Sequence, residues 1–326
     1  MNISVLIPCY NASRTIDATL KSVFAQTVQP DEIIVVDDGS TDGTMNRLDA
    51  YRDRISILSQ PNAGVAVART RLFQAARGEM LACLDADDIW HDRYLEAQRG
   101  MLQKHPEAVA SFTGHVVVSH HGAPHWGEIS SETLLKGLKY EPVPFLWNYN
   151  RFPYLFVTFS LCCARKSALA DMSGEIIHSN IKVDDHYFFL RLILRGPVVR
   201  TDAKLVGYRL TNESLSSDAV KINGLTVHAY ELLEVEYRER ASPELMTAFR
   251  ANHSSKQRTY AKTLLSAGHV RESRAQLMLA LSKSSSTSAR VKALGLLLIS
   301  FVPRWIRPRW QSVCRPTSTE VFANRA

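Results

Sequence analysis

Short apolar runs alternate with helix-like segments over roughly the first hundred residues, and this alternation limits the chain to few folds. Strands are expected in four short apolar runs, at residues 3–7, 32–36, 55–58 and 79–84. Helices are expected between them, the first capped by Ser13 and the third covering residues 63–77. This β-α-β-α-β order predicts an α/β fold with a mostly parallel sheet flanked by helices.

Carboxylates follow two of these expected strands. Asp37 and Asp38 end the second strand, and Asp85, Asp87 and Asp88 end the fourth. Ligands on parallel sheets bind beyond the carboxyl ends of the strands, so the two acidic clusters should share one crevice. Asp85 and Asp87 would project together from an extended chain and repel each other unless a cation bridges them. Mg²⁺ or Mn²⁺ would suit such a pair, although an isolated Asp-x-Asp triplet is also typical of a solvated loop.

Charge and cysteine usage narrow the class of protein. The formal charge of +7 and the pI of about 9.2 are compatible with phosphate-bearing substrates or anionic lipid. Much of the positive excess lies near the C-terminal end, so no nucleic-acid partner is expected. Five cysteines without metal-ligand spacing, together with an opening segment unlike a signal peptide, predict a cytoplasmic protein.

An ordered set of motifs resembles family 2 of the glycosyltransferases. The matching segments are residues 5–11 (VLIPCYN), 34–42 (IVVDDGSTD), 62–71 (NAGVAVARTR), 84–88 (LDADD), 184–191 (DDHYFFLR) and 208–216 (YRLTNESLS). The resemblance implies the type A nucleotide-sugar-binding fold over residues 1–217. In that fold a Rossmann-like, nucleotide-sugar-binding half (1–108) adjoins an acceptor half (109–217), and residues 218–326 would form a helical C-terminal extension.

The resemblance assigns several residues to donor binding. Pro8 and Tyr10 would lie along the nucleotide base, with the Tyr10 ring available for stacking. Asp38 would accept a hydrogen bond from the base, and Arg69 would lie near the nucleotide. Arg71 is instead expected to be a solvated or salt-bridged helix residue.

The resemblance also assigns the chemistry to carboxylates. Asp85 would reach the ribose and the metal, and Asp87 the metal on the diphosphate. Asp185 would be the general base of an inverting displacement, although an acidic pair can also merely complement a helix N-terminus. Asp88 would either support the metal-binding acids without itself touching the metal or cap a helix beginning near Trp90, and the cap is preferred.

One departure from the family concerns the closing loop. Many relatives carry a histidine where this chain has Thr211, so a histidine contact with the diphosphate or metal is not carried over. The resemblance still implies transfer of a sugar from a nucleoside diphosphate, UDP by preference, to a saccharide or lipid-linked saccharide acceptor in surface polysaccharide synthesis. The alternative is a nucleotide-sugar-binding subunit without turnover, which Thr211 favours and the intact Asp85, Asp87 and Asp185 disfavour.

The C-terminal region is largely helical in pattern over residues 225–283 and then strongly apolar over 293–302. The apolar run is shorter than the about 20 residues that a transmembrane helix needs. Arginine and tryptophan residues follow it, so residues 291–310 suit a helix lying in the lipid interface at the cytoplasmic face of the inner membrane. A C-terminal helix packed on the domain explains the same run equally well.

Overall fold

The computed structural model describes residues 1–118, 124, 126, 158–170, 184–209, 218–284 and 286–302, and the backbone of 139–141. The chain divides into two compact units. The first comprises Met1–Pro142 and Val157–Asn212, and the second comprises Val143–Phe156 and Glu213–Ala326. The division into 1–217 and 218–326, and that into halves at residue 108, stay predictions.

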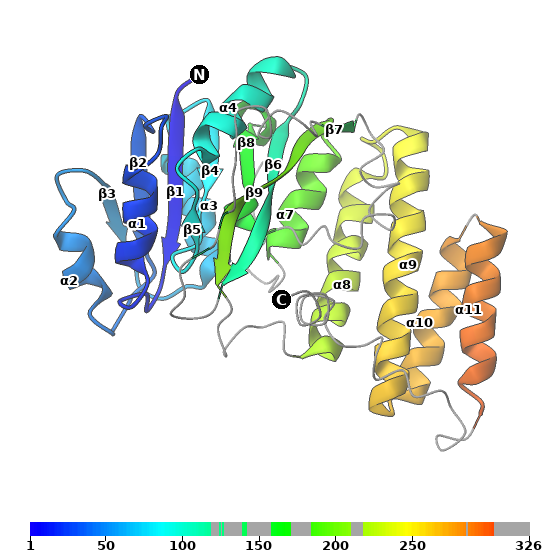
Figure 1. Ribbon diagram of the computed structural model, residues 1–326. Helices are drawn as coiled ribbons and strands as arrows, with labels where there is room; N and C mark the ends of the chain where they lie inside the picture. Colours follow the sequence, from blue (N-terminus) through cyan, green and yellow to red (C-terminus); the bar gives the residue numbers. More distant parts are fainter. Residues whose placement is uncertain are drawn as a thin grey trace. The chain divides into compact units, whose positions relative to one another are not determined.

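A mixed nine-stranded sheet forms the centre of the first unit, with strand order β3-β2-β1-β4-β8-β6-β9-β5 and β7 beside β9 (Figure 1). The strands are β1 (Ile3–Cys9), β2 (Glu32–Asp37), β3 (Ser56–Ser59), β4 (Met80–Cys83), β5 (Ile89–Trp90), β6 (Ala110–Val118), β7 (Lys139–Glu141), β8 (Cys162–Arg165) and β9 (Val198–Arg209). Strands β1 to β4 pair in parallel, which confirms the sheet expected from the alternation. Strand β8 runs antiparallel between β4 and β6.

Helices cover both faces of this sheet (Figure 1). They are α1 (Ile16–Phe24), α2 (Thr44–Asp49), α3 (Val65–Ala75), α4 (Tyr94–Lys104) and α7 (Asp184–Ile193), with the 3-10 turns η1 (Phe159–Leu161) and η2 (Lys166–Leu169). Successive side chains of a strand point to opposite faces of the sheet. Because helices cover both faces, every residue of β1 is buried. Val5 packs in the core that contains α1 and α4, whereas Leu6 faces Leu72 and Phe73 of α3.

The start of α1 differs from the expectation. Ser13 does not cap the helix, which begins at Ile16 with Thr15 in the N-cap position. The backbone N–H of Ser13 instead donates to the Asp42 carboxylate at 3.1 Å. A partner from the next strand–helix loop therefore displaces the local capping pattern.

Four helices make up the described part of the second unit and confirm the expected helical extension. They are α8 (Ala219–Tyr237), α9 (Pro243–Ala267), α10 (Val270–Lys283) and α11 (Thr287–Ile299). Helix α9 starts with a Ser242 side chain that accepts from the Leu245 N–H and ends at Gly268 in the left-handed conformation. Among the described residues, none of the helices combines the length and the apolar character required to cross a bilayer.

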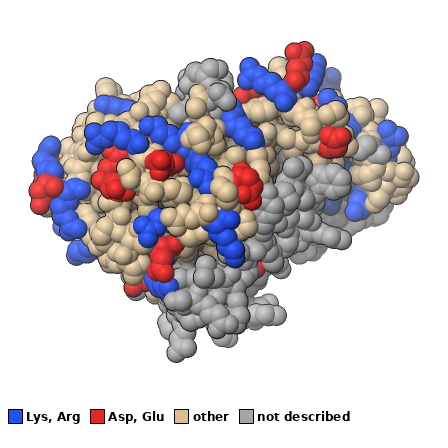
Figure 2. All heavy atoms as spheres, turned by 90° about the horizontal axis from the view of Figure 1, so that it is seen from above, with Lys and Arg blue, Asp and Glu red and all other residues tan. Residues whose placement is uncertain are grey.

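Basic and acidic side chains are interspersed on the face seen from above (Figure 2). Lys and Arg are frequent there, and Asp and Glu lie among them. On the described part of that face, the net positive charge of the chain is therefore mixed with acidic groups rather than gathered into one field.

Candidate functional site

The carboxyl ends of β1, β2 and β4 lie side by side. Cys9 pairs with Asp37, and Leu6 pairs with Cys83. The loops that follow these strands consequently leave the sheet at the same edge. They carry most of the residues assigned to donor and metal binding.

The loop after β1 is held by the loop after β2. The Asn11 N–H donates to the Ser40 hydroxyl at 2.9 Å, and the Thr41 N–H donates to the Asn11 side-chain oxygen at 2.9 Å. Asn11 adopts a positive φ of 49°, which asparagine tolerates better than most residues. Tyr10 is 51% exposed on this fixed loop, so its ring is accessible for stacking.

Asp38 is buried and fixes the start of α3. Its Oδ1 accepts from the Gln60 side-chain amide at 2.7 Å and from the Ala63 N–H at 2.9 Å, and its Oδ2 accepts from the Gly64 N–H at 2.8 Å. Gly39, with a φ of 76°, permits this approach, because a Cβ there would lie 2.8 Å from the Asn62 nitrogen. These three bonds leave about one of the four acceptor positions of the carboxylate for a ligand.

Arg69 connects three separate segments of the site. It lies on α3, and its guanidinium donates to Asp85 after β4 and to Asp184 at the start of α7. The guanidinium carbon also lies 3.7 Å from the centre of the Phe159 ring. The Arg69 side chain is only 9% exposed, so both carboxylates have a buried cationic partner.

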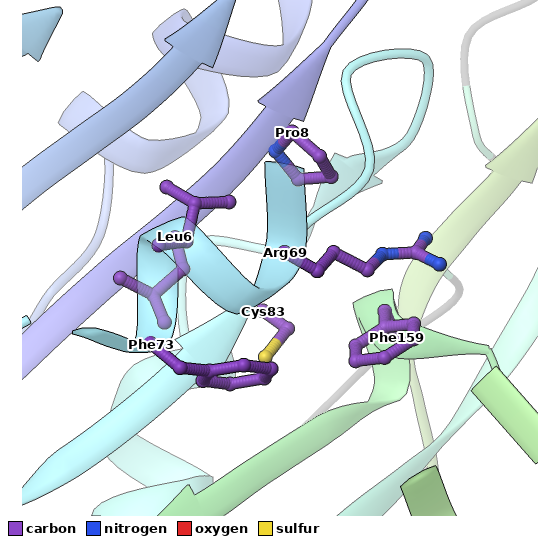
Figure 3. A pocket seen from close by; sticks show the side chains of 7 residues that line it. Leu6, Pro8, Arg69, Phe73, Cys83 and Phe159 are labelled. Atoms are coloured by element: carbon purple, nitrogen blue, oxygen red, sulfur yellow. The ribbon is translucent and has the colours of Figure 1, made fainter. Parts of the chain in front are cut away.

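A closely packed crevice without room for a water molecule adjoins Arg69 on this face of the sheet, and Figure 3 shows the guanidinium over Phe159 with Pro8 nearby. It is lined by Leu6, Pro8, Arg69, Leu72, Phe73, Cys83 and Phe159. The structure thus brings Pro8 and Arg69 to one crevice and joins Arg69 directly to Asp85. Asp38 reaches the same assembly indirectly, through the start of α3.

The two acids that open α7 differ in their surroundings. Asp184 is buried and bonded to Arg69. Burial, followed by the negative charge of Asp184, raises the pKa of Asp185 to about 7. A group with this proton affinity can take up a proton near neutral pH, which is what a general base requires.

Asp85, Asp87 and Asp88 form a tight loop after β4, called here the acidic loop (residues 85–88). Burial, followed by the negative charge of Asp85, raises the pKa of Asp87 to about 6. Two carboxylates of like charge repel each other and supply hard oxygen ligands, so the pair fits Mg²⁺ or Mn²⁺. No group of three or more potential ligands occurs among the described residues. A pair suffices for an ion that takes its remaining ligands from substrate phosphates.

The expected capping role of Asp88 is wrong. Ile89–Trp90 is strand β5 rather than the start of a helix, and α4 begins at Tyr94. The Asp88 side chain is buried and accepts hydrogen bonds from the Ser160 hydroxyl at 2.6 Å and from the Arg209 N–H at 2.9 Å. Both of its oxygens are thus bonded to residues distant in the sequence, and no helix starts at this point to be capped.

Two residues of η1 belong to this site although no motif indicated them. Phe159 lies against Arg69, and Ser160 bonds to Asp88. The signal available in the sequence was a single polar residue, Ser160, inside the apolar run 159–163. The loop containing Thr211 lies outside the described residues.

A family model described as "Glycosyl transferase family 2" matches residues 4–155. A Bacillus subtilis protein described as a putative teichuronic acid biosynthesis glycosyltransferase, TuaG, is 31% identical over 238 residues. That match covers 71% of this chain and 88% of the relative. WfgD of Escherichia coli, a UDP-Glc:alpha-D-GlcNAc-diphosphoundecaprenol beta-1,3-glucosyltransferase, is 40% identical over 104 residues, which are 31% of this chain and 41% of the relative.

Solved structures share the fold. TarS 1-349 of S. aureus, in complex with UDP-GlcNAc, superposes with a TM-score of 0.62 at 18% identity, covering 92% of this chain and 90% of that chain. The mannosyltransferase PcManGT of Pyrobaculum calidifontis, in complex with GDP-Man and Mn²⁺, has a TM-score of 0.61 at 15% identity, covering 100% of this chain and 88% of that chain. The expected glycosyltransferase type A fold is therefore confirmed.

Proposed function

Because this chain belongs to glycosyltransferase family 2, we propose that it transfers a sugar, with inversion, from a nucleoside diphosphate donor to a saccharide or lipid-linked saccharide acceptor. The observation that carries this proposal is the Arg69 bridge. Through it, the first acid of the metal-binding pair, Asp85, and the acidic pair that opens α7 belong to one bonded assembly. Donor and acceptor chemistry would therefore meet at one place.

Donor binding would use the edge formed by β1, β2 and β4. The base would lie along Pro8 and Tyr10 and bond to the remaining acceptor position of Asp38. A UDP-sugar is our preferred donor, since WfgD is described as acting on UDP-Glc and TarS was solved with UDP-GlcNAc. Asp85 and Asp87 would hold Mg²⁺ or Mn²⁺ against the diphosphate. When bound, the ion supplies Lewis-acid neutralisation of the charge that builds on the leaving diphosphate.

Sugar transfer would be a single displacement at the anomeric carbon. The acceptor hydroxyl oxygen forms a bond to that carbon while the bond to the diphosphate oxygen breaks, and its electron pair leaves with the diphosphate. Asp185 takes the proton of the attacking hydroxyl. Attack on the face opposite the leaving group inverts the configuration, with one carboxylate as base. Asp184 stays bonded to Arg69 and keeps the assembly together.

A nucleotide panel tests the proposed donor. A ligand that binds only the folded chain stabilises it by about 2.7 kcal/mol at 100 times its Kd. We therefore expect UDP and one UDP-sugar to raise the Tm in the presence of Mn²⁺, with GDP and GDP-sugars as controls. The bound UDP-sugar should then release UDP when acceptor lipid is added. A UDP-sugar that binds and is not consumed would favour a non-catalytic binding subunit, and a chain stabilised by no nucleotide would contradict the proposal.

We further propose that the acceptor is lipid-linked and that α11 contacts the membrane surface. WfgD, described as acting on a diphosphoundecaprenol-linked substrate, supports the first part. The second is supported by one apolar face of α11, where Val291, Leu294 and Leu298 are 61%, 48% and 70% exposed. Helix α11 contains no acidic residue, so nothing in it would repel anionic head groups.

Substitution within this face should weaken membrane binding. Leu298→Glu removes a side chain whose burial is worth about 1.5–3 kcal/mol and adds a charge. It should reduce binding to vesicles containing phosphatidylglycerol by about tenfold or more, measured by flotation. Val235→Glu is the matched control, because Val235 is 72% exposed on α8 and outside the face. Equal binding by both variants and the unsubstituted chain would rule out this contact.

A further inference from the structure

The acidic loop is anchored by groups other than the two carboxylates assigned to the metal. We infer that Ser160 and Asp88 are positioning residues that set the placement of Asp85 and Asp87 for metal-dependent donor binding. This inference rests on the proposed function and goes beyond it, because it assigns a role to two residues to which the proposed function gives no contact with donor or acceptor.

Ser160 is bonded to both ends of the acidic loop. Its hydroxyl donates to Asp88 Oδ2 at 2.6 Å and accepts from the Asp85 N–H at 3.0 Å. A hydroxyl has one proton to donate, so the bond to Asp88 directs its lone pairs toward Asp85. Ser160 is fully buried, and no water replaces either bond without opening the core.

The second oxygen of Asp88 binds the end of β9. Asp88 Oδ1 accepts from the Arg209 N–H at 2.9 Å, and the Arg209 side-chain Nε donates to the Asp87 carbonyl oxygen at 2.8 Å. The Thr19 hydroxyl lies 2.9 Å from the Ala86 carbonyl oxygen and 2.8 Å from the Asp88 carbonyl oxygen. Groups from three separate elements thus hold the backbone of the acidic loop. The carboxylates of Asp85 and Asp87 take no part in these bonds.

The same three-residue turn supports the cation of the site. Phe159 lies against the Arg69 guanidinium, and the neighbouring Ser160 holds the loop. The turn is itself fixed, because the Trp90 indole N–H donates to the Ser160 carbonyl oxygen at 2.9 Å. The same turn therefore supports Asp85 and Arg69, and through Arg69 it also supports Asp184.

This anchoring holds the acidic loop in place against the repulsion between the two carboxylates proposed to bind the metal. Like charges on a loose loop would separate and would have to be brought together again when the ion and the diphosphate bind. A loop that folding already holds in place avoids this cost, which is the general advantage of preorganised sites. Ser160 and Asp88 supply the hold without occupying an oxygen of Asp85 or Asp87.

The test compares two buried serines in the 326-residue chain. Ser160→Ala should weaken UDP binding in the presence of Mn²⁺ by about tenfold, measured by calorimetry, and leave metal-free UDP binding unchanged. Ser111→Ala is the matched control, because Ser111 is also fully buried and its hydroxyl donates to Gln98 rather than to the acidic loop. Both variants should lose similar thermal stability, and only Ser160→Ala should lose metal-dependent affinity.

Further variants keep the test decisive. Asp88→Asn combined with Ser160→Ala should cost less affinity than the sum of the two single effects, because both substitutions break one shared bond. If Ser160→Ala does not fold, Thr19→Val removes a loop bond at nearly constant volume and should give the same selective loss. Wild-type metal-dependent affinity in these variants overturns the inference. Absence of Mn²⁺-dependent binding of any nucleoside diphosphate to the unsubstituted chain instead overturns the proposed function, and the inference with it.

Discussion

Asp185→Asn is expected to slow sugar transfer by a factor of about 10²–10⁴, the usual contribution of a general base, while UDP binding is retained. Asparagine has nearly the same shape as aspartate and cannot take the acceptor proton. The carboxylate it replaces has a pKa raised to about 7, chiefly by burial. The rate of the unsubstituted chain should accordingly fall as the pH drops below about 7, and the variant should lack this fall.

Asp184→Asn is the informative control for that experiment. Asp184 is the neighbouring acid in the same helical turn, but its carboxylate pairs with Arg69. Its substitution leaves the buried guanidinium with one partner fewer and should lower both the Tm and donor affinity. Transfer at the normal rate by Asp185→Asn would contradict the base assignment. A loss of UDP binding in that variant would place Asp185 in the donor site.

Asp87→Ala should weaken Mn²⁺-dependent UDP binding on the order of 100-fold, since an ion of this type is held by only one or two protein carboxylates. Metal-free UDP binding should not change. Burial and the charge of Asp85 raise the pKa of Asp87 to about 6, so its ionised form is disfavoured by folding. Above pH 6 the variant should therefore be at least as stable as the unsubstituted chain in thermal unfolding.

Asp92→Ala provides a matched change of charge at a side chain that is 56% exposed and distant in role. It should leave Mn²⁺-dependent binding intact. Equal losses in the two variants would indicate a general effect of charge rather than a ligand. Retained affinity in Asp87→Ala would remove Asp87 from the metal site.

Local sequence patterns correctly predicted the strands and the edge of the sheet at which the acids lie. The apolar runs located β1 to β4, and the acids that follow them lie at one edge as parallel pairing requires. Asp88 shows where such reasoning ends. A carboxylate just before an expected helix reads as a cap, yet its partners Ser160 and Arg209 are 72 and 121 residues further along the chain. No short-range signal distinguishes the two roles.

Arg69 also makes a long-range contact that local patterns could not predict. Its position in a motif indicated a residue near the nucleotide, but the sequence did not reveal its bond to Asp184, 115 residues away. The resemblance named the participants of the site, and only the folded chain shows which of them hold one another. Ser160 was missed because it belongs to no motif and acts through the backbone of the acidic loop.

Asp38 has a consequence for redesigning donor preference. Its carboxylate holds the N–H groups of Ala63 and Gly64, from which the helix bearing Arg69 starts. A substitution of Asp38 meant to admit a different base would also release the first turn of α3. The Arg69 guanidinium, which α3 carries, would then be displaced. Directed evolution of the accepted nucleotide should therefore keep Asp38 constant and diversify Tyr10, whose ring is 51% exposed. In the proposed donor site one carboxylate would serve both selectivity for the base and the integrity of the reaction centre, so the two could not be varied independently there.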